Sequence, residues 1–280
     1  MPPADVLHYS AFTADGRGGN PAGVVLDARG MDATSMQGIA ATLGYSETAF
    51  LMPLDDGSFD IRYYSPLAEV AFCGHATIAA AVAHAEHHGA GEKRLHTRSG
   101  LVRVVVDEAN VATLASVEPR VAPLDDADLD LLLSALHWRR EDLDPSLPPA
   151  VAYAGAFHPV IATATRARLA LLDYDFDALR DLLAARGWTT VDLVWREDAT
   201  TFHARNPFPV GGVVEDPATG AAAAALGAFL AERHALPPGR AFTIRQGEDM
   251  GRPSRITVSV PDDSRAGIRV GGAAVRLAQD

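Results

Sequence analysis

The sequence predicts an α+β protein of two pseudo-symmetric halves, each a rolled β-sheet around one central α-helix. Two stretches support this prediction. A run of small helix-forming residues begins at Gly74, and a second such run begins at Gly220. Glu69 precedes the first glycine and Glu215 precedes the second with the same spacing. Because a helix enclosed by strands must be apolar on all sides, alanine-rich helices of this kind are expected at the centre of each half.

The first half alternates strand patterns with helix patterns. Asp32 or Thr34 can cap a helix that carries apolar residues at helical spacing, and Gly44 ends it. The loop 15–21 is rich in glycine, and the helix from Gly74 follows later in the chain. Alternating or continuous apolar segments predict strands at 6–12, 22–26, 47–51, 61–64, 95–98, 101–106 and 111–117.

The segment 118–123 gives the clearest boundary signal, because it holds two prolines with polar flanks. We therefore predict domains at 1–118 and 119–280, with the last strand of the chain as a candidate member of the first. In the second half the patterns predict helices at 125–136 and 176–186, and a loop at 145–149. Strands are expected at 157–163, 189–195, 200–204, 241–245, 256–260 and 268–276.

The composition is that of a soluble globular protein. Hydrophobic residues make up 48% of the 280 residues and charged residues 21%. A formal net charge of −12 argues against a nucleic-acid partner, for which a basic face would be expected. The single cysteine excludes a disulfide framework and a multi-cysteine metal site. No signal-peptide or membrane-spanning pattern is present, which predicts a cytoplasmic protein without a membrane partner.

Glu47 is an unusual residue for its position. It lies on a predicted strand whose two faces are both apolar, and carboxylates are seldom buried there. Burial would raise the pKa of Glu47 towards the range that is useful for proton transfer. The alternative is a strand-end glutamate that reaches solvent just after the helix stop at Gly44.

Cys73 and His75 flank the glycine of the first helix start. A thiolate there could act as a base or nucleophile, and a neutral histidine could exchange a proton with a substrate. A two-thiol racemase would need a second cysteine opposite, but Thr219 holds the matching position. We therefore expect His75 to matter and Cys73 to be a small packing residue.

The second helix start offers Asp216, Thr219 and Gly220. Thr219 and the amide of Gly220 could bind a carboxylate. Asp216 could face the substrate or simply cap the helix. Asn20 closes the glycine-rich loop, where an ordinary turn is the alternative, and Arg252 could pair with a substrate carboxylate.

A cluster of histidines, His84, His87 and His88, has helical spacing that is compatible with a metal ion. It lies at the polar end of its helix without a carboxylate partner. A solvated helix face is therefore the favoured interpretation, and no metal is predicted.

Taken together, several segments resemble the PhzF family, which is named after the phenazine-biosynthesis isomerase. They occur in family order and span nearly the whole chain. The matching segments are Gly19-Asn20-Pro21-Ala22, Ser46-Glu47-Thr48-Ala49-Phe50, Phe72-Cys73-Gly74-His75-Ala76-Thr77, Glu215-Asp216-Pro217-Ala218-Thr219-Gly220 and the stretch from Gln246-Gly247 through Met250-Gly251-Arg252-Pro253-Ser254.

The resemblance implies a diaminopimelate-epimerase-like fold with the active site in a cleft between the halves, no cofactor, and homodimers. It also implies that Glu47 shuttles a proton while His75 and Asp216 assist. Asn20, Gly74, Thr219 and Gly220 would contact the substrate.

One departure concerns the substrate. Ala221 and Ala223 stand where the phenazine enzyme carries serine and histidine, which weakens the transfer of its substrate but leaves the proton shuttle intact.

We therefore expect a cofactor-independent isomerase that moves a proton on a small, carboxylate-bearing, cyclic or aromatic-like substrate. One alternative is an epimerase or racemase of a small amino or hydroxy acid, for which Asp216 is the evident second base. The other is a noncatalytic binding protein on the same fold.

Overall fold

The computed structural model describes residues 5–263 and 266–278. Its contacts divide the chain into two compact units. Unit 1 runs to Ala115 and resumes at Gly271, while unit 2 is the continuous stretch Ser116–Val270. Strand β17 (Arg269–Arg276) crosses the second of these boundaries. Among the described residues, no helix is long and apolar enough to cross a membrane.

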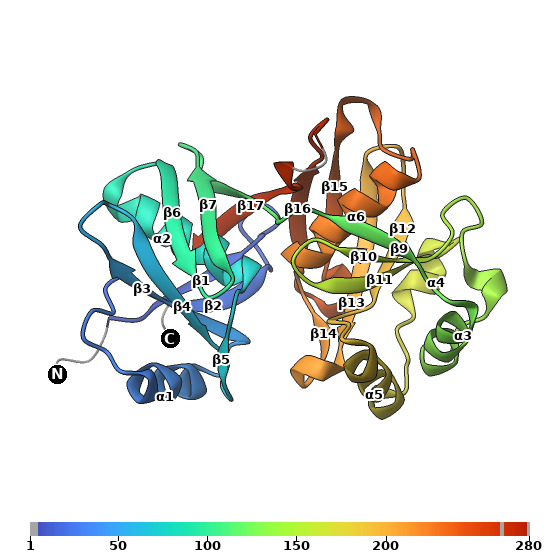
Figure 1. Cartoon of the computed structure of the whole chain (residues 1–280), viewed down its shortest axis with the longest axis horizontal. Helices are drawn as coiled ribbons and strands as arrows, with labels where there is room; N and C mark the ends of the chain where they lie inside the picture. Colours follow the sequence, from blue (N-terminus) through green and yellow to red (C-terminus); the bar gives the residue numbers. More distant parts are fainter. Residues whose placement is uncertain (1–4, 264–265, 279–280) are drawn as a thin grey trace. The chain divides into compact units, whose positions relative to one another are not determined.

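Unit 1 is a ring of strands closed around one helix (Figure 1). Along the ring, β1 pairs with β2, β2 with β3, β3 with β4, β4 with β6, β6 with β7, and β7 with β8. Strand β17 closes it by pairing with both β8 and β1. The strands are β1 (Leu7–Ala11), β2 (Asn20–Val25), β3 (Glu47–Pro53), β4 (Phe59–Tyr64), β5 (Glu69–Val70), β6 (Gly91–Thr97), β7 (Gly100–Val106) and β8 (Val111–Ala115).

The enclosed helix is α2 (Gly74–His88), which contacts β1, β2, β3, β7 and β8. Nearly every residue from His75 to Ala85 is buried. The small alanine side chains allow the strands to approach from all sides, and the helix is apolar all round as the sequence predicts. In unit 1 a closed sheet thus surrounds the helix.

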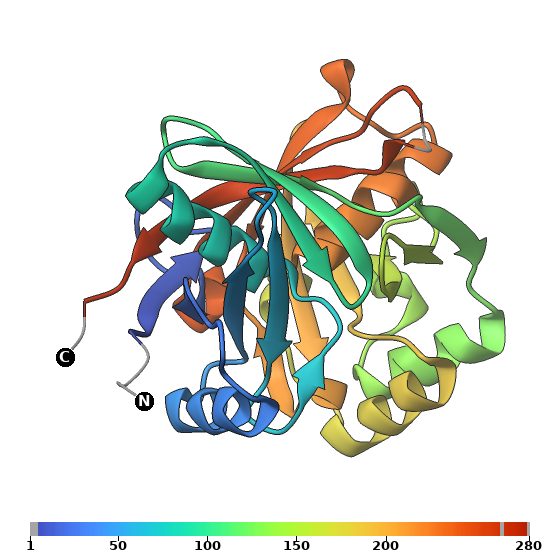
Figure 2. The same ribbon diagram turned by 60° about the vertical axis from the view of Figure 1, so that its left-hand side comes forward.

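Helix α1 (Ala33–Leu43), blue in Figure 2, packs against β3 and β4. The side chain of Asp32 caps its start by accepting a hydrogen bond from the Ser35 amide, and Gly44 ends it in the left-handed conformation with φ of 67°. Both ends agree with the sequence prediction. The C-terminal glycine matters for the site because Glu47 begins β3 directly afterwards.

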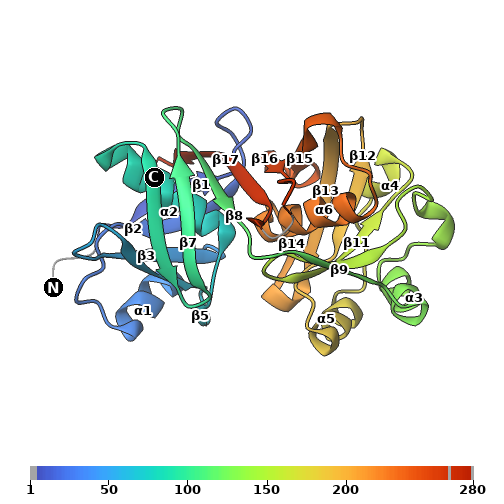
Figure 3. The same cartoon turned by 45° about the horizontal axis from the view of Figure 1, so that its top comes forward.

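Unit 2 contains a sheet in the order β9, β10, β11, β12, β13, β15, β16, with β14 paired to the end of β13. Helix α6 (Gly220–Glu232) contacts β9, β10, β11 and β16 (Figure 3). The strands are β9 (Arg120–Pro123), β10 (Ala150–Tyr153), β11 (Phe157–Ala162), β12 (Asp192–Arg196), β13 (Thr201–Phe208), β14 (Val213–Asp216), β15 (Ala241–Gln246) and β16 (Ser254–Ser259).

The remaining helices of unit 2 are α3 (Asp126–Ala135), α4 (Arg166–Ala170) and α5 (Phe176–Arg186). Leucines of α3 and α5 pack with Trp138, Trp188 and the sheet residues Ile161 and Leu193 in one core cluster. Short 3₁₀ turns lie at Arg140–Asp142, Pro209–Gly211, Pro238–Arg240 and Glu248–Met250.

The segment 118–123, which gave the boundary signal in the sequence, contributes a strand to unit 2. Arg120–Pro123 forms β9 and pairs antiparallel with β10, with Pro123 opposite Ala150. Its two prolines flank residues that still have amide groups for the ladder, so the segment can join the sheet at one edge.

Candidate active site

Glu47 and His75 meet in unit 1. Glu47 is the first residue of β3 and His75 is the second residue of α2. The His75 Nε2 lies 3.3 Å from Glu47 Oε2, and the two side chains are 8% and 16% exposed. Ser46 Oγ lies 3.2 Å from the same nitrogen. A largely buried carboxylate in direct contact with an imidazole is an arrangement that can take up and release protons.

Asn20 contacts the other nitrogen of the imidazole. Its Nδ2 lies 3.2 Å from His75 Nδ1. Because an amide N–H can only donate, this contact fits a neutral ring with its proton on Nε2. The Nε2 proton then points to the Glu47 carboxylate. In this arrangement an uncharged His75 imidazole donates a hydrogen bond that orients the Glu47 carboxylate.

Burial raises the pKa of Glu47, and this effect is opposed in part by hydrogen bonds from Ser46 and Cys73. A carboxylate that is difficult to ionise is a stronger base once it has lost its proton. The alternative interpretation placed Glu47 at a strand end facing solvent. In the structure only 16% of its side chain is exposed.

Cys73 is more than a packing residue in this geometry. Its Sγ lies 3.4 Å from His75 Nδ1 and 3.8 Å from Nε2, and its thiol also interacts with Glu47. Sequence reasoning set Cys73 aside because it lacks a partner thiol. Its position at the start of α2, two residues from His75, was evident in the sequence, but its contacts with the imidazole were not.

The start of α2 is fixed by hydrogen bonds of Thr77, and there is space beside Gly74. Thr77 Oγ1 donates to the Cys73 carbonyl oxygen at 2.6 Å and also contacts Tyr63 Oη of β4 at 2.6 Å. No side chain caps the helix at Cys73, and a Cβ placed on Gly74 would meet no described atom within 4 Å. The start of α2 therefore has room for a group beside Gly74, and the positive end of the helix dipole favours an anionic one.

Asn20 is placed by the glycine-rich loop before it. Gly19 has a φ of +75°, and a Cβ there would lie 2.5 Å from the Ala11 carbonyl oxygen. Ser10 Oγ also donates to the Gly18 carbonyl oxygen at 2.6 Å. Only glycine fits this close approach to β1, so the turn fixes the start of β2 and with it the amide of Asn20.

Asp216, Thr219 and Gly220 gather at the start of α6 in unit 2. Thr219 Oγ1 donates to Asp216 Oδ2 at 2.6 Å. Thr219 is the N-cap, yet its side chain makes no cap hydrogen bond, and the helix begins at Gly220. Asp216 is the last residue of β14. This helix start, like that of α2, presents the positive end of a helix dipole, which favours an anion.

Gln246 of β15 organises that turn, a role that its sequence position did not reveal. Its Oε1 accepts from the Thr219 amide at 3.0 Å, and its Nε2 donates to the Asp216 carbonyl oxygen at 2.7 Å and to Thr219 Oγ1 at 3.0 Å. The side chain is buried. Arg252, the other candidate of this segment, lies in the turn that follows β15, where its amide donates to the Gly247 carbonyl oxygen at 2.9 Å.

An arginine–glutamate pair precedes each of the two helices. Arg62 of β4 binds Glu69 of β5 with two hydrogen bonds of 2.8 and 2.7 Å. Arg205 of β13 binds Glu215 of β14 in the same bidentate manner, at 2.9 and 2.5 Å. The glutamates that repeat in the sequence thus fasten a short strand to its longer neighbour, just before each helix start.

The histidines at the end of α2 differ in environment. His87 and His88 are exposed, as expected for a solvated face. His84 instead packs its ring edge against Phe59, with centroids 4.8 Å apart. Its burial lowers the pKa of His84 to about 4, so the prediction of a solvated face is wrong for this residue.

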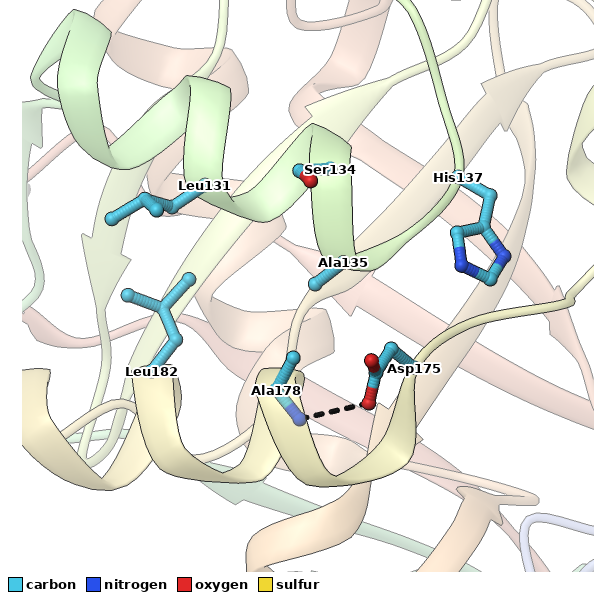
Figure 4. Close-up of a pocket in the computed structure, with 7 residues that line it drawn as sticks. All are labelled: Leu131, Ser134, Ala135, His137, Asp175, Ala178 and Leu182. Carbon is cyan, nitrogen blue, oxygen red and sulfur yellow. Dashed lines mark hydrogen bonds between the residues drawn. The ribbon is translucent and has the colours of Figure 1, made fainter.

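A pocket of about 340 Å³ lies between α3 and α5 (Figure 4). Asp175 is its acidic residue, but its carboxylate accepts a hydrogen bond from the Ala178 amide at 3.0 Å and so caps α5. Because this carboxylate is already used to cap a helix, the pocket is a weaker candidate for the active site than the region around Glu47. Its lining is Leu131, Ser134, Ala135, His137, Asp175, Ala178 and Leu182.

Metal-ligand atoms come together once in the described ranges. One ligand atom each from Glu47, Cys73 and His75 lies within 4.8 Å of the other two. The three donors are a carboxylate oxygen, a sulfur and an imidazole nitrogen, which are the ligand types of zinc sites.

Comparison with known proteins connects this geometry to a family. Residues 9–280 match the family model PhzC-PhzF, described as phenazine biosynthesis-like protein. The uncharacterized isomerase YddE of Escherichia coli is 34% identical over 286 residues, which cover 97% of this chain and 96% of the relative.

Two further relatives extend this likeness. The trans-2,3-dihydro-3-hydroxyanthranilate isomerase of Pseudomonas chlororaphis is 31% identical over 256 residues, 88% of each chain. A crystallographic neighbour, a predicted epimerase from Pseudomonas aeruginosa, has a TM-score of 0.84 and 28% identity, and the match covers 98% of this chain and 96% of the neighbour. The predicted PhzF resemblance is confirmed by these matches.

Proposed function

The chain belongs to the PhzC-PhzF family of phenazine biosynthesis-like proteins, whose curated relatives are named isomerases, and from this premise we propose its reaction. Glu47 removes a proton from a carbon atom of a small, carboxylate-bearing substrate and returns it at another carbon on the same face. The observation that carries the proposal is the contact of 3.3 Å between the largely buried Glu47 carboxylate and His75 Nε2.

Three features support Glu47 as the base. Burial raises its pKa, which increases the basicity of the ionised form. His75 holds the carboxylate with a neutral imidazole, since Asn20 contacts Nδ1. Ser46 and Cys73 provide further hydrogen bonds to the carboxylate. Together these contacts fix one orientation of the carboxylate, as positioned acid–base catalysis requires.

The first amides of α2 support binding of the substrate carboxylate or of the anion that forms during transfer. They carry the positive end of the helix dipole, and the space over Gly74 is open. The repeat of the sequence pattern is our reason for assigning substrate binding to Asp216, Thr219 and Gly220 as well. No step of the proposed transfer requires a cofactor.

The substrate we propose is a cyclic or aromatic-like amino or hydroxy acid. The named substrate of the Pseudomonas chlororaphis relative, trans-2,3-dihydro-3-hydroxyanthranilate, is the natural first probe. Ala221 and Ala223 offer methyl groups where the phenazine enzyme has a hydroxyl and an imidazole. We therefore expect a substrate with fewer polar groups near the start of α6 to be preferred.

The decisive experiment replaces Glu47 with glutamine. Positioned acid–base catalysis contributes about 10²–10⁴ in rate, so Glu47→Gln should lose at least this factor in kcat while its thermal unfolding stays cooperative. Turnover is measured by product formation and by deuterium uptake from D2O. The matched control is Glu69→Gln, which alters a carboxylate of the same unit that is bound to Arg62. Near-normal turnover in Glu47→Gln would exclude Glu47 as the base.

Epimerisation is the second candidate, and the likeness to the predicted epimerase of Pseudomonas aeruginosa favours it. It requires a second acid or base to protonate the opposite face, and Asp216 is the candidate. Reaction in D2O separates the two functions, because an isomerase relocates the double bond while an epimerase inverts one labelled carbon. Under epimerisation, Asp216→Asn should abolish inversion in both directions, because asparagine can neither donate nor remove the proton on the opposite face, while Glu47 should still exchange the proton on its own face with solvent.

A further inference from the structure

We propose that Glu47, Cys73 and His75 form a binding site for a zinc-like divalent ion, and that occupation of this site switches the enzyme off. The binding half of the proposal concerns the three side chains alone. The inhibitory half rests on the proposed role of Glu47 as the base.

The three donor atoms lie close enough together for one ion to reach all of them, since each is within 4.8 Å of the other two. Zinc binds sulfur at about 2.3 Å, imidazole nitrogen at about 2.0–2.1 Å and carboxylate oxygen at about 2.0–2.2 Å, so two ligands of one ion lie roughly 3.3–3.6 Å apart. The His75 Nε2 is 3.3 Å from Glu47 Oε2 and 3.8 Å from Cys73 Sγ. Cys73 Sγ lies closer to Nδ1, at 3.4 Å, so the Cys73 side chain must rotate to bring its sulfur to the Nε2 side of the ring when an ion binds.

Three protein ligands leave the fourth position open. Sites with one open position take up water or a substrate atom there, whereas structural zinc sites are closed. Glu47 remains 16% exposed at its side chain, and the space at Gly74 is open. An ion can therefore reach the donors from solvent, and a substrate carboxylate would compete for the same position.

Asn20 can support the bound form. Binding at Nε2 moves the imidazole proton to Nδ1, where it needs an acceptor. Asn20 lies 3.2 Å from Nδ1, and rotation of its amide presents Oδ1 in place of Nδ2. A ligand histidine is commonly held in this way by an outer hydrogen-bond acceptor.

Binding changes the protonation of the site. The thiol of Cys73 must give its proton to solvent before the sulfur can bind the ion, and Glu47 must bind as the carboxylate. Uptake of one ion therefore releases protons to the buffer, and affinity falls as pH decreases. The bound carboxylate can no longer remove a proton from substrate, so turnover stops.

The first test titrates Co²⁺ into the metal-free protein. Co²⁺ takes the place of zinc in such sites and is coloured, and a thiolate ligand produces a sulfur-to-cobalt charge-transfer band. We expect one equivalent of Co²⁺ to give this band, with displacement by Zn²⁺ and release of protons into an unbuffered solution. Absence of the band would overturn the proposal.

Variants assign the ligands. Loss of an outer partner costs about 10–100-fold in metal affinity, so Cys73→Ser and Glu47→Gln should each cost at least about 100-fold, and Asn20→Ala about 10–100-fold. Cys73→Ser also loses the thiolate band. Thermal unfolding without metal shows that each variant is folded.

The control removes the imidazoles at the end of α2, where His84 and His88 rings lie 4.4 Å apart. A His84→Asn/His88→Asn variant should keep the band and the affinity. Loss of binding in this variant instead of in Cys73→Ser would place the ion on the helix end and overturn the proposal.

Zn²⁺ inhibition is then measured with the isomerase assay. Inhibition should follow the binding curve and be reversed by a chelator. Turnover that continues with one equivalent of zinc bound would refute the inhibitory half. Cobalt binding without turnover in the metal-free protein would instead count against the proposed function and leave the metal site standing.

Discussion

At the scale of single residues, unit 2 buries an acid and an imidazole in one polar chain. His158 Nδ1 contacts Thr190 Oγ1 at 2.9 Å, Thr190 donates to Asn206 Oδ1 at 2.7 Å, and Asn206 Nδ2 donates to Asp192 Oδ1 at 3.1 Å. Burial lowers the pKa of His158 to about 4 and raises the pKa of Asp192 to about 7. Both groups are therefore held in their uncharged forms under mildly acidic conditions.

These two shifts act on stability with opposite signs. The folded state keeps the proton of Asp192 up to about pH 7, whereas the unfolded chain loses it near 3.8, so this group costs stability as pH rises between them. The unfolded chain protonates His158 below about 6.5 and the folded state only below about 4, so this group adds stability as pH rises through that window. Their effects largely cancel between about pH 4 and 6.5.

Asp192→Asn should remove the contribution of Asp192 to the pH dependence of stability and leave that of His158. The amide keeps an acceptor for Asn206 but has no proton to lose. The stability of the variant relative to the parent should therefore rise by about 1.4 kcal/mol per pH unit between pH 4 and 7. Urea unfolding at pH 4.5 and 7.5 measures it, with the exposed Asp181→Asn as control. A difference between parent and variant that does not change with pH would contradict the assignment.

At the scale of elements, the paired glutamates before α2 and α6 differ in burial. Arg205 and Glu215 are 10% and 5% exposed at their side chains, while Arg62 and Glu69 are 18% and 28% exposed. Removal of one partner of a buried ion pair costs about 3–5 kcal/mol, whereas exposed pairs contribute about 0–1 kcal/mol. The two ion pairs therefore share a bidentate geometry, but we expect them to contribute differently to the free energy of unfolding.

Glu215→Gln and Glu69→Gln measure this difference. We expect the first to lower the free energy of unfolding by several kcal/mol, up to about 3–5, because it leaves the Arg205 charge buried. The second should cost about 1 kcal/mol or less, because Arg62 stays in partial contact with water. Denaturant midpoints of both variants provide the comparison, and equal losses would show that burial is not the deciding factor.

The turn after β15 gives a second matched pair of variants. Gly247 and Gly251 have φ of +74° and +73°. A Cβ on Gly247 would lie 2.3 Å from the Arg252 carbonyl oxygen and 2.8 Å from that of Pro217, while a Cβ on Gly251 would meet no described atom within 4 Å. The backbone of Gly247 thus supports the turn that carries Asp216 and Thr219.

Gly247→Ala should be clearly more destabilising than Gly251→Ala. Gly251→Ala meets only the left-handed backbone cost of about 1–2 kcal/mol, and Gly247→Ala adds the collision with Pro217 and Arg252. Thermal unfolding of the two variants measures the difference. Similar melting temperatures would mean that the turn yields to the added methyl group.

Local signals in the sequence were sufficient to predict most of the helices but not all of the strands. Asp32, Gly44 and the glycine-led alanine runs act within a few residues, so α1, α2 and α6 could be predicted with their starts. The short strands β5, β9, β10 and β14 and helix α4 were missed. Each of these four strands is defined by a partner elsewhere in the chain rather than by its own pattern.

The same limit applies to the candidate site. Glu47 and His75 stood out because their residue types are unusual in apolar surroundings, and the structure brings them together. The contacts of Cys73 with both residues, and of Gln246 with Asp216 and Thr219, depend on how loops and strands fold back. No spacing in the sequence carries that information.

At the scale of the whole molecule, unit 2 is inserted into unit 1 as one continuous stretch. Its two ends meet, because the Ser116 amide donates to the Ile268 carbonyl oxygen at 2.8 Å and the Ile268 amide donates to Ser116 Oγ at 2.9 Å. It also has its own core of leucines and tryptophans around α3 and α5. Ends that lie side by side are typical of a domain that can be inserted or removed.

The fragment 116–270 should therefore fold by itself, while the fragment 1–115 should not. The first fragment keeps its sheet and its core. The second lacks β17, which closes the ring between β1 and β8, and two strand edges are left unpaired. Covalent addition of 271–280 after Ala115 through a short flexible linker should restore the ring and a cooperative melt. Circular dichroism and thermal unfolding of the three chains test this, and a folded 1–115 fragment would show that β17 is dispensable for closing the ring.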